Sequence, residues 1–238
     1  MKHFFTRKSS VCLLALCSVL LVSCAAQING SLAADGSASL TVSMSLQPRM
    51  AALIRSLSAA GGQADAPLLD GPAIALSMSQ APGIASVSFA NTAPAAIEGR
   101  IQIARINEFL SVAEGRGFIA FEQTASGGRC AVSIDRKTSP EILELFSMEI
   151  SDYLNALMAP IASGEEITKA EYLELVTSFY NKAISDEIAA SRIRASIDFP
   201  GPVRSVTGGV FTGRRANFDI PLLDLLVLET PLAYEVRW

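Results

Sequence analysis

The sequence predicts an α+β fold, in which an antiparallel sheet of hairpins and meanders packs against a long αα-hairpin. Apolar residues alternate at period two through much of residues 28–135, a pattern typical of half-buried strands. They recur at helical spacing from about 139 to 190, and the alternation then returns up to residue 238. Amphipathic helices ordinarily supply core, so we expect the helical pair to cover the inner face of the sheet.

The first elements are a hairpin and a short helix. Alternation on both sides of Ala34-Asp35-Gly36 indicates a β-hairpin with an Asp-Gly turn. Residues 48–57 have helical spacing, which Gly61-Gly62 ends. The stretch from 59 to 82 is rich in Ala, Gly, Ser and Pro and has room for one further short helix at about 73–80.

Further strands are predicted from Ile84 onward, over residues 97–106, 117–124 and 129–135. Gly127-Gly128 indicates the turn of the last hairpin, because glycine supplies the positive φ that tight turns need. These strands are expected to form an antiparallel meander. Residues 107–113 interrupt it, as a helical turn or as an irregular crossing, and periodicity does not decide between the two.

Two helix starts predict the αα-hairpin. Thr138-Ser139-Pro140-Glu141 places a hydroxyl residue three positions before Glu and proline in the first turn. An apolar stripe follows from 142 to 158 and ends near Pro160. A second capping box, from Thr168 to Glu171, opens a helix whose apolar stripe continues to Ile188.

The tail predicts three strands, over residues 192–199, 215–220 and 232–238, with a turn at 200–202. The hairpin region between the first two contains Gly208-Gly209 and Gly213. Tyr234, Val236 and Trp238 alternate with charged residues in the last strand, so its removal should destabilise the domain.

The N-terminus carries the signature of a secretory signal peptide. A basic start with Lys2, Arg7 and Lys8 precedes an apolar run from Val11 to Val22, and small residues lead to a cysteine. The run is too short to cross a bilayer, which needs about 20 apolar residues. We therefore expect cleavage, and Cys12 and Cys17 would leave with the discarded peptide.

The four residues Leu21, Val22, Ser23 and Cys24 resemble the lipobox of bacterial lipoproteins. The resemblance implies that the Cys24 thiol receives a diacylglycerol, that the signal peptide is cut before it, and that the new amine is acylated. Two or more acyl chains give stable anchoring to a membrane. The predicted organisation is a cleaved signal peptide at 1–23, a lipidated N-terminus with the start of the first strand at 24–34, and a single α+β domain at 35–238.

The lipobox resemblance also implies the location of the protein. It places the chain in the bacterial cell envelope as a lipid-anchored membrane protein. Ala25 and Ala26 follow the cysteine without an Asp, which in lipoproteins resembling those of enteric bacteria favours the outer membrane, facing the periplasm, over the inner one.

Charge excludes several partners. The formal net charge is -4, and loss of three basic and no acidic residues with the signal peptide leaves -7. An acidic chain without a basic cluster repels phosphate backbones, so nucleic acid is not expected as a partner. Attraction to an anionic lipid surface is not expected either, and the membrane is held by the covalent lipid.

The mature chain lacks the side chain on which much catalysis depends. The single histidine of the full sequence, His3, lies in the predicted signal peptide, so the mature chain has none. This excludes Ser/His/Asp and Cys/His nucleophilic systems and histidine-based zinc sites. No cofactor, no metal site and no catalytic residue is predicted, and the chain is not expected to be an enzyme. An enzyme that uses Asp, Glu or Lys would need carboxylates that converge in a cleft.

Three local patterns are candidate sites. Cys130, the thiol that remains once Cys24 is acylated, lies on an apolar strand face and is expected to be buried rather than activated by Arg129. Glu165-Glu166 fits a solvated turn better than an acid/base pair. Arg214-Arg215, near Gly208-Gly209, fits a hairpin edge better than an anion site.

The C-terminal residues bear a family resemblance. Phe199-Pro200-Gly201-Pro202-Val203, then Gly208, Ala216-Asn217-Phe218 and a terminal strand resemble LppM-type envelope lipoproteins. The resemblance covers about the last forty residues. It implies an α+β domain with strands around long helices and a role in binding or trafficking envelope lipids.

Together these observations predict a membrane-anchored envelope lipoprotein whose domain is a non-catalytic binding module for a lipid or other hydrophobic ligand. The alternative is a structural or assembly protein that holds another envelope component. The sequence assigns no ligand-binding residues.

Overall fold

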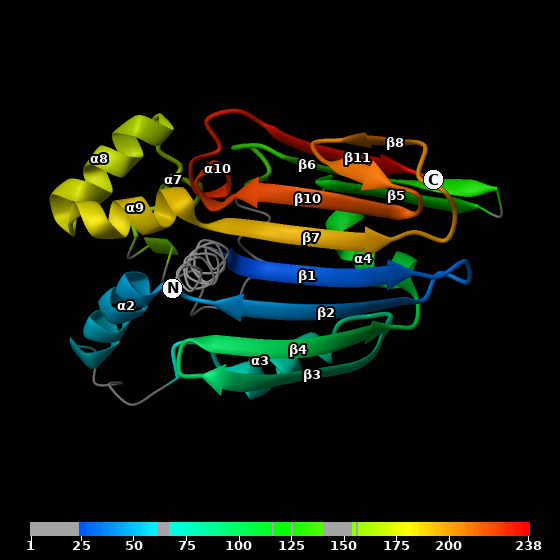
Figure 1. Cartoon of the computed structure of the whole chain (residues 1–238), viewed down its shortest axis with the longest axis horizontal. Helices are drawn as coiled ribbons and strands as arrows, with labels where there is room; N and C mark the ends of the chain where they lie inside the picture. Colours follow the sequence, from blue (N-terminus) through cyan, green and yellow to red (C-terminus); the bar gives the residue numbers. More distant parts are fainter. Residues whose placement is uncertain (1–23, 61–66, 116, 125, 140–153, 156) are drawn as a thin grey trace, which may run out of the picture.

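The chain folds into a mixed α/β structure with two sheets (Figure 1). A computed structural model describes residues 24–60, 67–115, 117–124, 126–139, 154–155 and 157–238. The predicted signal peptide at 1–23 and most of the first predicted long helix lie outside the described residues.

The larger sheet has seven strands in the order β3-β4-β2-β1-β7-β10-β9. Its neighbouring strands are antiparallel, except that β1 and β7 are parallel. β1 is therefore a central strand, hydrogen-bonded on both sides. The strand bounds are β1 Cys24–Leu32, β2 Ala38–Ser45, β3 Ile84–Ala93, β4 Ala96–Ile103, β7 Arg192–Asp198, β9 Val210–Thr212 and β10 Arg215–Pro221.

The smaller sheet has four antiparallel strands in the order β5-β6-β11-β8. Its strands are β5 Ile119–Thr124, β6 Gly127–Ile134, β8 Ser205–Thr207 and β11 Leu232–Arg237. The predicted hairpin and the predicted terminal strand are both present in it, but Gly127 and Gly128 lie in β6, opposite Thr124 and Gln123, rather than in the turn.

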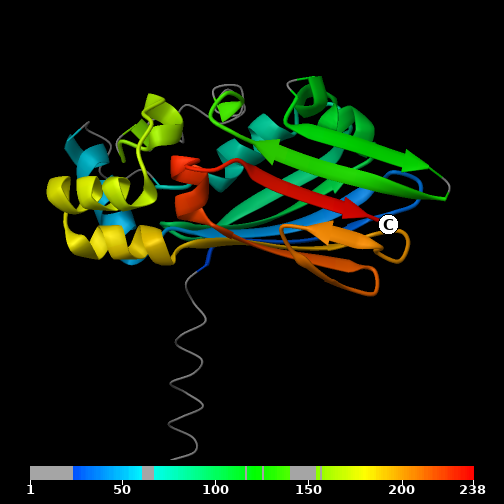
Figure 2. The same ribbon diagram turned by 90° about the horizontal axis from the view of Figure 1, so that it is seen from above.

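Seven helices lie among the described residues. They are α2 Pro48–Ala60, α3 Gly71–Met78, α4 Ile106–Gly115, α7 Pro160–Ser163, α8 Lys169–Phe179, α9 Lys182–Ala190 and α10 Leu222–Val227. Turned by 90°, the molecule has α3 and the smaller sheet on the same side of the larger sheet (Figure 2). We call this side the inner face and the opposite side the outer face.

The predicted long αα-hairpin at 139–190 is wrong. Its second arm is two short helices, α8 and α9, which are separated at Tyr180 and Asn181. Asn181 has an extended backbone, and its side chain accepts a hydrogen bond of 3.0 Å from the Ile184 amide, so it begins a new helix. The apolar stripe continues across this break, and periodicity therefore did not reveal it.

The prediction of one antiparallel sheet is also wrong. β1 pairs with β7 in parallel, with Ile28 opposite Ala195, a contact between residues far apart in sequence. The expected meander is divided between the two sheets, because α4 carries the chain from β4 to β5. Residues 107–113, left open by periodicity, thus form a helix.

Two main core clusters hold the elements together. The first joins α2, α8, α9 and α10 at one end of the larger sheet, around the fully buried Tyr172, Val176 and Ile188. The second joins the two sheets at the other end, around Phe199, Ala216 and Trp238.

Candidate functional site

β1 begins at Cys24, the residue at which lipid attachment is predicted. The backbone of Cys24 is already in register with Arg192 of β7. Two residues later Ala26 is buried and lies opposite Met44 and Ile193. A lipid on Cys24 would thus be joined directly to a central strand with no linker. The other predicted recognition residues, Leu21, Val22 and Ser23, lie outside the described residues.

One row of residues crosses six strands on the inner face of the larger sheet. Strand register places these residues side by side, since each is opposite the next. Aromatic rings stand at the two ends, and small or branched aliphatic residues lie between them. We call it the apolar row; it consists of Phe89, Gly99, Val42, Ile28, Ala195 and Phe218.

Glycine at position 99 shapes the apolar row. A Cβ there would lie 2.2 Å from Cδ1 of Phe89, so the phenyl ring occupies the space above the glycine. Gly30 acts similarly in the neighbouring row, where a Cβ would lie 2.4 Å from Cδ2 of Leu40. Side chains on the inner face thus lean over positions that have no side chain of their own.

Every residue of the apolar row is half-buried rather than buried. The rows on either side contain fully buried residues, among them Ile97 at 2% exposure and Ile101 at 4%. Within the described part of the chain, neither main core cluster includes Ile28, Val42 or Ala195. The apolar row therefore lies between the two clusters.

A hollow of about 430 Å³, lined by polar residues and by Val210 and Phe218, lies beside the outer face of β7 and β10. Arg194 and Asp219 line it with their atoms Nε and Oδ1 3.7 Å apart, and Ser196 donates a hydrogen bond of 2.8 Å to Asn217. Gly208 and Gly209 form its rim. The glycine pair thus faces Arg194 rather than the two arginines singled out from the sequence.

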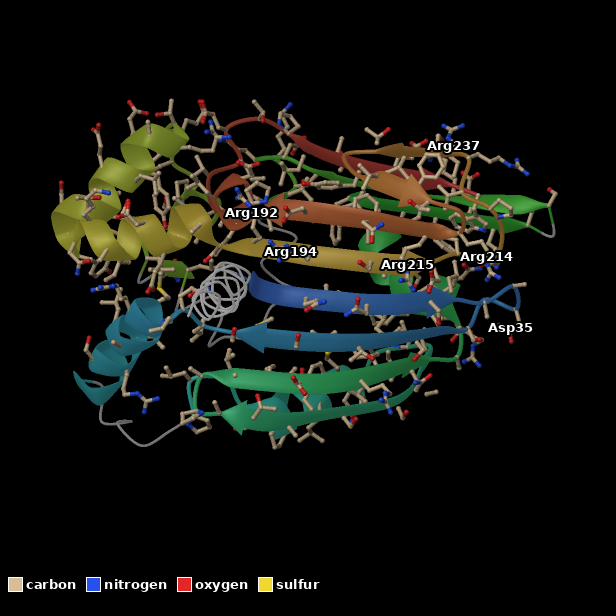
Figure 3. The ribbon with its side chains drawn as sticks, in the orientation of Figure 1. Asp35, Arg192, Arg194, Arg214, Arg215 and Arg237 are labelled. Atoms are coloured by element: carbon tan, nitrogen blue, oxygen red, sulfur yellow. The ribbon has the colours of Figure 1, made fainter. Side chains whose placement is uncertain are left out.

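Arg214 and Arg215, at the start of β10, bond to the end of the neighbouring strand β7 (Figure 3). Arg215 donates two hydrogen bonds to the Asp198 carboxylate, at 2.9 and 2.6 Å. These bonds hold the pKa of Asp198 below its usual range. Arg214 donates to the backbone oxygen of Phe199 at 2.8 Å. Both guanidinium groups thus have partners on the β7 side. The predicted hairpin is present, but β10 lies between β7 and β9 and is not an edge strand.

A second hollow, of about 320 Å³, lies between the start of α2 and α9. The Glu187 carboxylate accepts hydrogen bonds from the backbone amides of Arg49 and Met50, at 3.1 and 2.9 Å. This carboxylate ties the first turn of α2 to α9 and neutralises the positive end of the helix dipole. Its role is structural.

The remaining sequence candidates lie apart from the apolar row. Cys130 is half-buried and packs against the second core cluster, in register with Phe121. Glu165 and Glu166 are exposed between α7 and α8, and Glu166 lies 3.8 Å from Arg136. Among the described residues, no group of three His, Cys, Asp or Glu side chains is placed to hold a metal ion.

No helix in the described part of the chain is long and apolar enough to cross a membrane.

No protein-family model matches this chain, and no curated protein matches it. Among solved structures, the fold is similar to the folded domain of LppM from Mycobacterium tuberculosis, determined by NMR. The two share 10% sequence identity and a TM-score of 0.42, over 89% of this chain and 86% of that chain. LppM is also the type of protein that the C-terminal residues resemble. A likeness at this level carries no argument about function.

Sequence reasoning missed the apolar row, although all its residues lie on predicted or observed strands. Alternation identifies which residues of one strand share a face. It does not tell which strands are neighbours, and here the decisive pairing is the parallel one between β1 and β7. The available signal was the small residues Gly99 and Ala195, which interrupt otherwise larger apolar faces.

Proposed function

We propose that this chain is a lipid-anchored protein of the bacterial envelope whose domain binds an acyl chain along the apolar row. The observation that carries the proposal is the row itself, six half-buried residues in register, one of which belongs to the strand that begins at Cys24. The lipobox-like residues supply the anchor, and the row supplies the binding surface.

The chemistry of the apolar row suits a hydrocarbon ligand. None of its side chains has a polar atom, and the backbone groups of the strands are hydrogen-bonded within the sheet. Five inter-strand spacings of about 4.8 Å give it a length of about 24 Å. Covering half-buried apolar surface is favourable by roughly 25 cal/mol per Å², which makes a long flexible chain a better ligand than a compact polar one.

The anchor is tested by expressing the full chain in a bacterium and measuring the mass of the mature protein. We expect a chain that starts at residue 24 and carries a diacylglyceryl group and an amide-linked acyl group. A Cys24→Ser variant should keep residues 1–23 and carry neither group. A wild-type chain that is cut elsewhere or not acylated contradicts the anchor.

Binding is tested with cis-parinaric acid, a fatty acid whose fluorescence rises in an apolar site. Ala195→Phe places a ring between Ile28 and Phe218 and should lower the affinity at least tenfold, about 1.4 kcal/mol. The matched control is Thr41→Phe, which introduces the same ring on the exposed outer face of β2. Far-UV circular dichroism establishes that both variants are folded.

The result that contradicts acyl-chain binding is equally specific. A wild-type protein that neither raises the fluorescence nor carries non-covalent lipid in native mass spectrometry has no such site. Equal affinities of the wild type and Ala195→Phe would place the ligand elsewhere.

A second candidate function, assembly with another envelope protein, is favoured by one edge of the larger sheet. β9 is an edge strand, on which Val210 is 68% exposed and Phe211 44% exposed. Exposed apolar edge strands are places where another chain can pair. A photo-crosslinking residue at position 210 should then capture one defined partner in cells, whereas the same residue at the exposed position 76 of α3 should not.

A further inference from the structure

We infer that the outer face of the seven-stranded sheet rests on the lipid headgroups of the membrane that holds Cys24, with Arg192 and Arg194 against lipid phosphates. The inference depends on the anchor of the proposed function and adds the surface by which the domain contacts the membrane. It does not depend on acyl-chain binding at the apolar row.

No linker separates the anchor at Cys24 from the folded domain. β1 begins at Cys24, and Ala26 is buried and paired on both sides. Acyl chains on Cys24 enter the bilayer next to the protein, so this end of β1 must lie at the headgroups. The part of the molecule around the start of β1 therefore contacts the membrane.

The helices near the start of β1 exclude an upright orientation, in which the strands would be perpendicular to the membrane. α2, α8 and α9 extend beyond the start of β1, as Figure 1 shows. α9 leads directly into β7, and Glu187 ties α2 to it. An upright domain would push these helices, with Arg49 and Asp186, below the level of Cys24 and into the bilayer, where charged side chains are costly.

The two faces of the larger sheet differ in the elements that lie on them, and only one of them can approach a membrane. α3 and the smaller sheet lie on the inner side and would keep this face of the larger sheet away from a flat membrane (Figure 2). The outer side of β1, β2 and β7 carries no helix of the described residues. This side can approach a flat surface.

The side chains of the outer face suit the headgroup layer and not the hydrocarbon. Register places uncharged polar residues on six strands, and hydrogen bonds link some of them, for example Gln102 to Ser39 at 2.9 Å. These residues are Gln27, Asn29, Ser31, Ser39, Thr41, Ser43, Ser86, Ser88, Gln102, Ser196 and Asn217.

Charge on the outer face is opposite in sign to that of the chain as a whole. It carries four arginines, at positions 100, 192, 194 and 215, against three carboxylates, at positions 98, 198 and 219, a net charge of +1. The chain from residue 24 onward carries -7. The net charge of -7 predicts no attraction to an anionic surface, whereas the sheet brings Arg100 and Arg215 onto the same face as Arg192 and Arg194.

Two arginines lie nearest to the anchor. Arg192 is in register with Cys24, and Arg194 is in register with Gln27, three residues further along β1 (Figure 3). A guanidinium binds phosphate through paired N–H donors. Arg192 and Arg194 are therefore the side chains placed to bind the phosphates of lipids around the acyl chains.

The test measures which face of the lipidated full-length protein contacts a vesicle. The protein is purified from bacterial membranes and placed in phosphatidylglycerol/phosphatidylcholine vesicles that contain a lipid with a nitroxide on its headgroup. In a Cys130→Ser background, a bimane fluorophore is attached at Asn29→Cys on the outer face. The matched control is Leu76→Cys on α3, which is 70% exposed on the opposite side.

We expect the nitroxide to quench the fluorophore at position 29 and to leave the one at position 76 at the level seen without nitroxide. Thr41→Cys, exposed on the outer face of β2, gives the same readout if Asn29→Cys does not fold. Equal quenching at positions 29 and 76, or quenching at 76 alone, overturns the orientation.

The role of Arg192 and Arg194 in membrane contact is tested with a separate variant. Arg192→Gln with Arg194→Gln should reduce the quenching at position 29, whereas Arg105→Gln, outside the outer face, should not. Unchanged quenching in the double variant overturns the role of the two arginines. Mass measurement of the same sample separates the two proposals, because an unacylated chain overturns both, while an acylated, vesicle-bound chain without quenching at 29 overturns the orientation alone.

Discussion

Trp238 and Gly128 exchange two backbone hydrogen bonds of 3.1 Å, and the Trp238 indole lies over the glycine. A Cβ on Gly128 would be 2.2 Å from the indole atom Cζ2. The indole is 3% exposed, and its centroid lies 4.7 Å from that of the Phe199 ring. The last residue of the chain thus fills the second core cluster, and β6 is shaped to receive it.

Gly128→Ala should destabilise the protein by about 1–3 kcal/mol, since the new methyl group overpacks a filled site. Urea unfolding measures the change. Gly201→Ala is the control, because its Cβ would lie at an ordinary 3.8 Å from Trp238 and should change stability by less than about 0.5 kcal/mol. Equal losses of stability in the two variants would mean that the Trp238 indole moves aside to make room for the new methyl group.

Deletion of residues 234–238 should have a larger effect than any single substitution in this cluster. β11 lies between β6 and β8, so its loss leaves two strands without their shared partner. We expect the cooperative thermal transition to be lost or shifted far down. Phe179→Ala, at a side chain that is 67% exposed, should leave the transition in place. A truncated chain that unfolds at the wild-type temperature refutes a structural role for the C-terminus.

Glu235 should make stability depend on acid. Hydrogen bonds from Arg129 and Arg237 lower its pKa from 4.5 to about 2 in the folded protein. A depressed folded-state pKa stabilises above the unfolded value, so this contribution is present above about pH 4.5 and is lost as the pH falls toward 2. The melting temperatures of the wild type and Glu235→Gln should differ at pH 7 and converge near pH 2. A difference that does not change over this range contradicts the assignment.

Asn181→Ala should cost about 1 kcal/mol, because it removes the side-chain oxygen that caps α9. Asn181→Asp keeps an acceptor in place and should retain most of the stability. Guanidinium unfolding compares the three proteins. If alanine is as stable as asparagine, another contact must fix the break between α8 and α9.

The sequence predicted individual strands and turns better than their neighbours in space. The Asp35-Gly36 turn, the hairpin of β5 and β6 and the capping box at Thr168 follow from local chemistry, and all three are present, although Gly127 and Gly128 lie in β6 and not in the turn. Thr168 and Glu171 bond reciprocally, as the spacing predicts. Such features depend on residues within a few positions of one another.

Long-range pairing could not be predicted in the same way. Nothing near Ile28 indicates that Ala195 will lie beside it, because a parallel pair is set by the whole arrangement of the sheet. The division of α8 from α9 was missed for a different reason, since the polar Asn181 lies within an otherwise continuous stripe. The candidate site shows the same limit: lipidation at Cys24 is predicted from a local pattern and stays a prediction, whereas the apolar row depends on long-range pairing and was not predicted.

The start of β1 at Cys24 has a consequence for where the protein can work. A lipoprotein with a long tether can reach across the envelope, but a domain fixed at its first strand remains within one molecular diameter of its own bilayer. With Cys24 acylated and the outer face on the membrane, a ligand on the apolar row would lie on the far side of the sheet from that bilayer and would have to travel around a sheet edge to reach it. Transfer of such a ligand to or from the opposite membrane would then require a second component that reaches this domain.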